Sequence, residues 1–342
     1  MERKLRIFVV ISTIGDGVLR VPSVILPEEE GVHYVVSWQR GEGDSATESP
    51  SAVRGGEGDS ATKSPSAVRG GEEDSATESP SAVRGEEGDS ATESPSAVRG
   101  GGREKEKERE EVMRLLDERK DVTLTTMTGR GLCRNRNHAI ETAIGLLTDP
   151  LEDAIFVVAD DDERFLPDAF ARVREYFIRY ARLDVALLRV RDRATSDYLK
   201  RYPPQAIRYA DRPRWYYPSS VELAFRARLW HAGVRFDERF GLGSARLSSG
   251  EEEVFLADAL ALGLKVWVLP VELCETDADT TGRAALDVKA LRSKGAVYGR
   301  LLPRWRAFFR ALREAASLAL HHHRSPVPIF RNIWYGFKYI RS

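Results

Sequence analysis

The sequence predicts an α/β protein whose core is a mostly parallel, doubly wound β-sheet. Its 342 residues are 42% apolar, which is enough for a large hydrophobic core. β-Branched runs of strand length alternate with segments of helix length, and this alternation is typical of parallel sheets. Polar segments directly follow two of the runs, where the carboxyl ends of parallel strands would place a ligand site.

Each strand and helix is predicted from its own local pattern. Residues 5–12 are a β-branched run that ends in the turn-prone sequence TIGDG, and residues 32–38 form a second run. Residues 103–120 have acids early and apolar residues on one side, as expected of a solvated amphipathic helix. After that helix we expect a strand at 121–127, a helix at 136–147, a strand at 154–159, a helix opened by Pro167 at 167–183 and a strand at 184–190.

A repeat interrupts this pattern between the second strand and the first long helix. The unit GEGDSATESPSAVRG occurs four times between residues 41 and 100, with single changes at Lys63, Glu73 and Glu86. Each copy has one valine and no aromatic residue, which is too little apolar surface to offset the ordering of the backbone. We therefore expect a disordered insertion in one domain formed by residues 1–40 and 101–285; the alternative is a partner-binding tandem array.

The net charge, the cysteine spacing and the length of the apolar runs indicate the compartment and the partners to expect. The formal charge of −1 combines −8 in residues 41–100 with +7 in the rest of the chain. Two distant cysteines lack the spacing of a zinc site or a disulfide framework, and no run reaches the roughly 20 apolar residues of a membrane span. The N-terminus does not resemble a secretory signal. These features predict a cytoplasmic protein with no nucleic-acid partner.

Three aspartates, Asp160 to Asp162, follow the strand expected at 154–159. Carboxylates crowded at one strand end repel each other unless water or a cation lies between them. Residues two apart in an extended segment point the same way, so Asp160 and Asp162 could share a divalent cation with Asp161 turned away. The alternative is that residues 161–163 cap the next helix.

Two further segments combine glycines with charged residues. Residues 129–140, GRGLCRNRNHAI, place cations at the start of a helix, where they would suit a diphosphate; the alternative is a turn followed by a basic helix face. Residues 236–270 contain a glycine-rich loop, three glutamates, a helix and a strand. A carboxylate at that helix start can cap the helix, or it can act as a general base.

These segments together resemble the GT-A-type inverting glycosyltransferases of the large bacterial family 2. The resemblance rests on the strand-end ISTIG, on GLCRNRNHAI, on the aspartates of VVADDDERFLPDAF and on FDERFGLGSARLSSGEEEVFLADALALG. The four motifs occur in the family's order and span residues 5 to 270 apart from the repeats. The resemblance implies a GT-A-like fold, a nucleotide-diphosphate sugar donor, a saccharide or lipid-linked acceptor and a divalent metal, Mn²⁺ or Mg²⁺.

The resemblance also implies roles for particular residues. The family's catalytic-base aspartate falls on Glu252, next to Glu251, while Glu253 offers another register. In the family, the second strand often ends in acidic residues that contact the nucleotide base, whereas this chain has Ser37, Trp38 and Gln39 there. The family also often has a downstream histidine that completes the metal site. This chain lacks it, so Asp277 or Asp279 would have to substitute. The donor-binding set is Thr13, Gly15, Arg134, Asn137, Asp160 and Asp162, of which Asp160 and Asp162 would also hold the metal.

The C-terminal region, residues 286–342, differs from the rest in composition. From Val288 onward twelve Lys or Arg residues stand against one acid, Glu314, and aromatic residues are interleaved with them. We expect a basic, aromatic helical region that either contacts the inner face of a membrane or packs on the catalytic domain.

The function expected from these observations is metal-dependent, inverting glycosyl transfer in surface polysaccharide or glycolipid synthesis. Two alternatives remain open: a catalytically silent binding or scaffold protein on the same fold, and a sugar-phosphate nucleotidyltransferase.

Overall fold

The computed structural model describes residues 5–40, 95–147, 153–277 and 286–342. The chain divides into two compact units, one formed by residues 1–42 and 103–342 and the other by residues 43–102. Repeat residues 41–94, for which we predicted disorder, lie outside the described residues. A helix begins at Pro95 and includes the last six residues of the final repeat.

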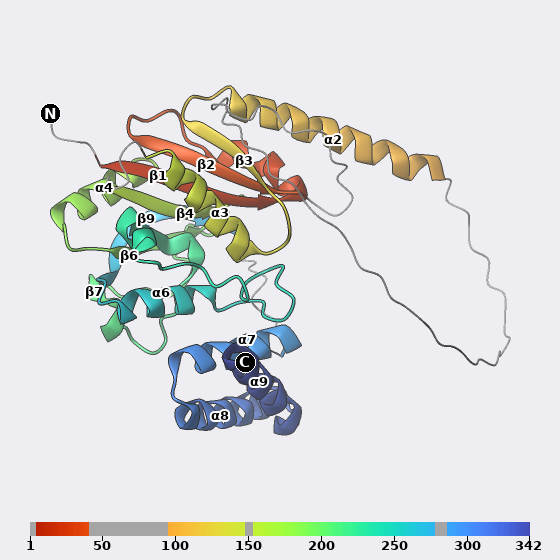
Figure 1. Ribbon diagram of the computed structural model, residues 1–342, viewed down its shortest axis with the longest axis vertical. Coiled ribbons are helices and arrows are strands. Elements are labelled where there is room, and N and C mark those ends of the chain that lie inside the picture. The colour runs from red at the N-terminus through yellow and green to blue at the C-terminus, as the bar shows by residue number, and fades with distance from the viewer. Residues whose placement is uncertain (1–4, 41–94, 148–152, 278–285) are drawn as a thin grey trace, which may run out of the picture. The chain divides into compact units, whose positions relative to one another are not determined.

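A mixed β-sheet forms the centre of the larger unit (Figure 1). Its order is β3-β2-β1-β4-β8-β6-β9-β5, with β7 paired to β9. The strands that the structure describes are β1 (Arg6–Ile14), β2 (Val32–Gln39), β3 (Val122–Met127), β4 (Ala154–Asp160), β5 (Arg164–Phe165), β6 (Val185–Asp192), β7 (Ile207–Arg208), β8 (Leu223–Arg226) and β9 (Val266–Thr276).

The prediction of a mostly parallel sheet is wrong for half of this sheet. Strands β1, β2, β3 and β4 are parallel, as is the pair β6 and β9. Strand β8 lies antiparallel between β4 and β6, and the two-residue strands β5 and β7 pair antiparallel with β9. Strands this short have no recognisable sequence period, and only their neighbours in the sheet define them.

Helices cover both faces of the sheet, as a doubly wound arrangement requires. The described helices are α1 (Val21–Val24), α2 (Pro95–Asp117), α3 (Leu132–Gly145), α4 (Ala169–Arg179), α5 (Ala227–His231), α6 (Glu251–Ala261), α7 (Val288–Leu301), α8 (Arg304–His322) and α9 (Pro326–Arg341), with 3₁₀ turns η1 (Gly15–Arg20), η2 (Tyr209–Asp211) and η3 (Ser220–Glu222). None of the helices in these residues is long and apolar enough to cross a membrane.

The alternation of side chains along β1 separates two hydrophobic cores. Phe8 and Val10 face a core that α3 and α6 cover, whereas Ile7 and Ile11 face a second core that includes α1 and α4. Both sets are fully buried, so β1 is a central strand. Its carboxyl end therefore lies between the two helix layers.

The C-terminal helices pack closely through glycines. A Cβ atom at Gly295 of α7 would lie 1.7 Å from the Ile333 carbonyl oxygen of α9, and one at Gly336 of α9 would lie 1.8 Å from the Arg292 carbonyl oxygen. The backbones of α7 and α9 thus touch, and the three blue helices of Figure 1 form one cluster. Ala296 and Ile340 join the core under α3 and α6, so this cluster packs on the sheet domain.

Candidate active site

A cavity of about 570 Å³ opens where β1 and β4 end. Polar side chains from six segments that are far apart in sequence meet there, which is the position expected for a ligand in an open α/β sheet. The lining residues on which the argument depends are Ser12, Arg20, Arg136, Asp160, Asp161, Asp162, Ser220, Glu251, Glu252, Asp277 and Asp287.

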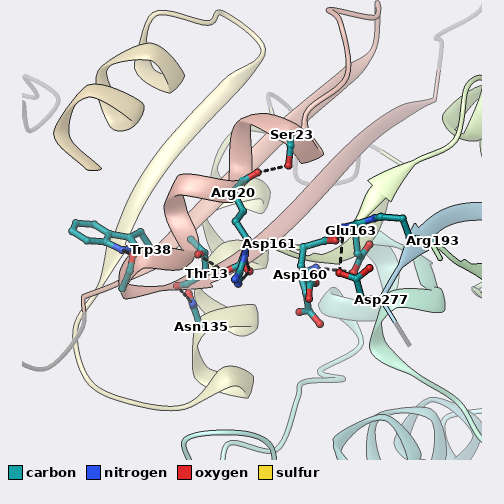
Figure 2. A network of polar contacts seen from close by, with 12 residues as sticks. Thr13, Arg20, Ser23, Trp38, Asn135, Asp160, Asp161, Glu163, Arg193 and Asp277 are labelled. Carbon is teal, nitrogen blue, oxygen red and sulfur yellow. Dashed lines mark hydrogen bonds and ion pairs between the residues drawn. The ribbon is translucent and has the colours of Figure 1, made fainter. Parts of the chain in front are cut away.

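Asp161 binds the segment that follows β1. Thr13 Oγ1 donates to Asp161 Oδ2 at 2.5 Å, and Arg20 Nε donates to Asp161 Oδ1 at 3.1 Å (Figure 2). A Cβ atom at Gly17 would lie 2.0 Å from Asp161 Oδ2, so only glycine leaves room for the carboxylate. Asp161 also lines the cavity, so the expectation that its side chain is turned away from the ligand side is wrong.

Asp160 points in a different direction from Asp161. Its carboxylate accepts a hydrogen bond from Arg136 Nη2 at 2.9 Å, and its backbone N–H donates to Glu163 Oε1 at 2.8 Å. Figure 2 shows Asp160 beside Glu163 and Asp161 beside Thr13. Burial, and then the neighbouring charge of Asp160, raise the pKa of Glu163 well above its ordinary value. The Glu163 carboxyl thus supports the turn through the backbone N–H of Asp160.

The alternative that residues 161–163 cap the next helix is wrong. Helix α4 begins at Ala169, not at Pro167, and its N-cap residue is Asp168, which has φ 59° and makes no side-chain cap hydrogen bond. The acids at 161 and 163 are engaged by Thr13, Arg20 and the turn itself. Asp161 lines the cavity and Glu163 binds the backbone of the turn, so neither acid serves the helix.

Arg136 connects the aspartate turn to the glutamates of α6. Its side chain is 1% exposed, and its Nη1 atom lies 3.5 Å from Glu251 Oε1 and 3.9 Å from Glu252 Oε1. Burial by itself would lower the pKa of Arg136, but the three carboxylates around it raise the pKa. One guanidinium therefore holds two acidic segments together across the floor of the cavity.

The three glutamates occupy the first turn of α6, where the helix dipole favours negative charge. Burial and the charge of Glu252 raise the pKa of Glu251 to about 8, although Arg136 opposes this. Burial also raises the pKa of Glu252, although the positive charge of Arg136 offsets part of this rise. Glu251 and Glu252 line the cavity, whereas Glu253 is not among its lining residues, so the register with Glu253 as the base has no geometric support.

Thr13 and Gly15 lie behind the cavity wall and shape it. The Thr13 carbonyl accepts from Asn135 Nδ2 at 3.0 Å, and the Gly15 carbonyl accepts from Trp38 Nε1 at 3.0 Å. Gly15 has φ 53°, which glycine adopts without strain. Neither residue is part of the lining, although their neighbours Ser12 and Ile14 are.

Arg134 and Asn137 do not line the cavity. Arg134 is half exposed and pairs with Glu238 at 3.2 Å. Asn137 is buried, and its amide donates to the Phe236 carbonyl at 2.9 Å, which fastens α3 to the loop before α6. The cation that sequence reasoning missed is Arg136, two positions farther along the same motif. Half a turn of helix separates the exposed arginine from the buried one, and only the packing of α3 distinguishes them.

The cavity has two further walls that the sequence did not indicate. Arg20 lies beside the aspartate turn, while Asp287 and Ala290 come from the start of α7. Asp287 caps α7 by accepting from the backbone N–H groups of Lys289 and Ala290. The C-terminal region is thus part of the site, and the capping pattern before Val288 was the available signal.

Within the described residues, which do not include the candidate Asp279, the set of protein ligands for a divalent metal is incomplete. Among the described residues, no three acidic, histidine or cysteine side chains lie close enough together to hold an ion. Asp160 and Asp162 both line the cavity, and burial together with the other two aspartates raises the pKa of Asp162. Asp277 pairs with Arg193 at 3.3 Å. Mg²⁺ is commonly held by one or two carboxylates plus phosphate oxygens and water, so two aspartates fit an ion that arrives with a diphosphate.

Comparison with known proteins adds structural likenesses only. No protein-family model and no curated protein matches the sequence. The structure resembles residues 1–349 of S. aureus TarS with a TM-score of 0.44 and 12% identity, covering 89% of this chain and 68% of that one. A second S. aureus TarS structure gives 0.43 and 12%, covering 89% and 42%. Both TM-scores are below 0.5, so neither likeness assigns an activity.

Proposed function

We propose that this protein is a metal-dependent glycosyltransferase that moves a sugar from a nucleotide-diphosphate donor to a hydroxyl acceptor with inversion. The observation that carries the proposal is the meeting, in one cavity, of the aspartate turn after β4 and the glutamates of α6. The motif order of the sequence supports the same assignment. The resemblance to family 2 adds a saccharide or lipid-linked acceptor in surface polysaccharide or glycolipid synthesis.

The proposed general base is Glu252. The acceptor oxygen forms a bond to the anomeric carbon, the bond from that carbon to the diphosphate oxygen breaks, and Glu252 takes the acceptor proton. Attack opposite the leaving group inverts the anomeric centre. The side chain of Glu252 is 14% exposed, against 6% for Glu251, so Glu252 is the more accessible to an acceptor.

Asp160 and Asp162 are the proposed metal ligands, and the ion would neutralise charge on the leaving diphosphate. Arg20, which is paired with Asp161, also lines the cavity and would place a second cationic group near the donor. Thr13 and Gly15 hold the segment that would face the nucleotide base. Arg136 keeps Asp160 in place and does not itself need to touch the donor.

Titration of nucleoside diphosphates into the protein tests the proposal. Binding by calorimetry in manganese should be lost or much weakened in chelator, and a panel of nucleotide sugars should contain a donor that the protein turns over. A ligand at about 100 times its dissociation constant stabilises by about 2.7 kcal/mol, so a thermal-shift screen can select the nucleotide first. Equal binding in manganese and chelator would refute the metal, and tight binding without turnover of any donor would favour a silent binding protein.

Peripheral membrane contact through α8 is part of the proposal. Trp305, Phe309, Leu312 and Leu320 of α8 are between 50% and 79% exposed and follow helical spacing along one side. Ala307, Ala311, Ala315 and Ala319 form the opposite, buried side. Arginines on the same helix flank the exposed stripe, which is the pattern of a helix lying in an anionic lipid surface.

A further inference from the structure

A second cavity, of about 520 Å³, lies between the loop after η2 and helix α8. It shares no lining residue with the first cavity. The loop contributes two arginines and α8 contributes two more, while the other lining residues are uncharged at neutral pH. The complete lining is Arg212, Pro213, Arg214, Tyr216, Arg310 and Arg313.

Two acids that are adjacent to these arginines in sequence form ion pairs with other cations. Glu314 of α8 pairs with Lys294 at 2.6 Å. Asp211, next to Arg212 in sequence, pairs with Arg208 at 2.6 Å. Among the described residues, Arg214 and Arg313 take part in no hydrogen bond or ion pair. Within the described residues, none of the four arginines forms an ion pair with a carboxylate at contact distance, so the cavity concentrates positive charge.

Aromatic groups, and not carboxylates, orient the other two guanidinium groups. Arg212 stacks 3.8 Å above the ring of Tyr209 and donates to the Tyr209 carbonyl at 2.9 Å. Arg310 Nε lies 3.5 Å from Tyr298 Oη. Stacked or hydroxyl-bound arginines keep donors free for a ligand, and their planar fork matches the oxygens of a phosphate.

Buried contacts anchor both walls of this cavity. Tyr216 Oη donates to the buried carboxylate of Glu222 at 2.7 Å, which fixes the loop. The alanine stripe of α8 is buried against its neighbours, which fixes the helix. The backbones that carry the four arginines are therefore already fixed before an anion binds between them.

We propose that this four-arginine cavity binds a phosphate group. Two sources of phosphate fit: a soluble phosphorylated ligand and the headgroup of an anionic lipid, since the exposed stripe of α8 adjoins Arg313 along the helix. The site does not depend on the proposed transferase activity, because it shares no residue with that cavity. Its failure would leave the glycosyltransferase proposal untouched.

Calorimetric titration of inorganic pyrophosphate in chelator, without metal, tests the site. The double variant Arg214→Gln/Arg313→Gln removes the two arginines that make no hydrogen bond or ion pair within the described residues. Charge-assisted hydrogen bonds are the strongest that a guanidinium makes to phosphate oxygens, so pyrophosphate should bind at least about tenfold more weakly. The matched control is Arg179→Gln/Arg182→Gln, which removes the same charge from exposed positions outside both the cavity and α8 and should change the affinity less than about twofold.

Flotation with phosphatidylcholine vesicles, with and without phosphatidylglycerol, separates the two sources. Loss of pyrophosphate binding in the cavity variant with unchanged flotation identifies a soluble ligand. Loss of flotation on phosphatidylglycerol in the cavity variant but not in the control identifies a lipid headgroup. The proposal is overturned if neither probe binds the wild-type protein, or if the cavity and control variants lose binding equally.

Discussion

Nη2 of Arg136 lies 2.9 Å from Oδ1 of Asp160, and the same guanidinium reaches Glu251 on a helix 115 positions away in the chain. The contact joins the end of a central strand to the first turn of α6. Since Arg136 is 1% exposed, its charge and those of its partners depend on each other. Removing one partner of a buried pair leaves the other uncompensated, which costs far more than an exposed pair contributes.

The first prediction is that Arg136→Gln lowers the free energy of unfolding, measured in urea, by about 3–5 kcal/mol. The reason is that the change leaves buried carboxylates without a positive partner. Arg134→Gln on the same helix is the control and should cost about 0–1 kcal/mol, since Arg134 and Glu238 are both about half exposed. Equal losses in the two variants would show that Arg136 is not the electrostatic centre of the site.

The second prediction concerns Gly17, where a Cβ atom would lie 2.0 Å from Asp161 Oδ2. Gly17→Ala should push Asp161 away from Thr13, lower the melting temperature and weaken binding of a nucleoside diphosphate. Gly145→Ala is the control, because a Cβ atom there meets nothing within 4 Å. A helical Gly-to-Ala change of that kind is neutral or stabilises by about 0.4–1 kcal/mol. Wild-type behaviour of Gly17→Ala would contradict the crowding around Asp161.

The third prediction is a pH dependence of stability. The pKa of Glu251 is raised to about 8 in the folded protein, mainly by burial. At pH values between the ordinary pKa of glutamate and about 8, the folded state binds more protons than the unfolded state. This contribution to the free energy of unfolding is therefore complete at low pH and is lost as the pH rises toward about 8. Glu251→Gln should flatten the fall of the melting temperature between about pH 5 and 8, whereas the exposed change Glu175→Gln should leave the slope as in wild type.

The fourth prediction separates the two halves of the proposed reaction. Asp162→Asn keeps the shape of the side chain but removes charge from the metal ligand, so donor binding in manganese should weaken sharply. Glu252→Gln should leave donor affinity nearly intact while turnover falls by about 10²–10⁴, because a base acts on the acceptor. Calorimetry and a turnover assay on both variants check this. Weakened donor binding in Glu252→Gln without loss of turnover would exclude Glu252 as the base.

The fifth prediction is that the exposed stripe of α8 directs membrane contact. Trp305→Ser/Phe309→Ser should reduce flotation with anionic vesicles at low salt, since both side chains are more than 60% exposed. Ile178→Ser/Leu262→Ser removes comparably exposed apolar side chains elsewhere and should have no effect. High salt should weaken flotation of every variant through screening. Identical flotation of the two double variants would contradict a role for this face.

The sequence by itself determined the features that local patterns encode. The β-branched runs of β1, β2 and β4 gave buried strands because neighbouring apolar residues must leave water on both faces of the sheet. The aspartates at the end of β4 and the glutamates opening α6 were recognisable because the ends of such strands and helices carry ligand sites. Their meeting in one cavity followed from strand order and motif order.

Only the tertiary structure decided which neighbouring residue does what. Arg134 and Arg136 are equivalent in local pattern, yet the packing of α3 leaves one half exposed and encloses the other among carboxylates. The antiparallel position of β8 and the cavity wall formed by α7 likewise depend on contacts between distant segments. Charge pairing, burial and the choice of partner strand are set by what the rest of the chain places nearby, and no local period of the sequence encodes that.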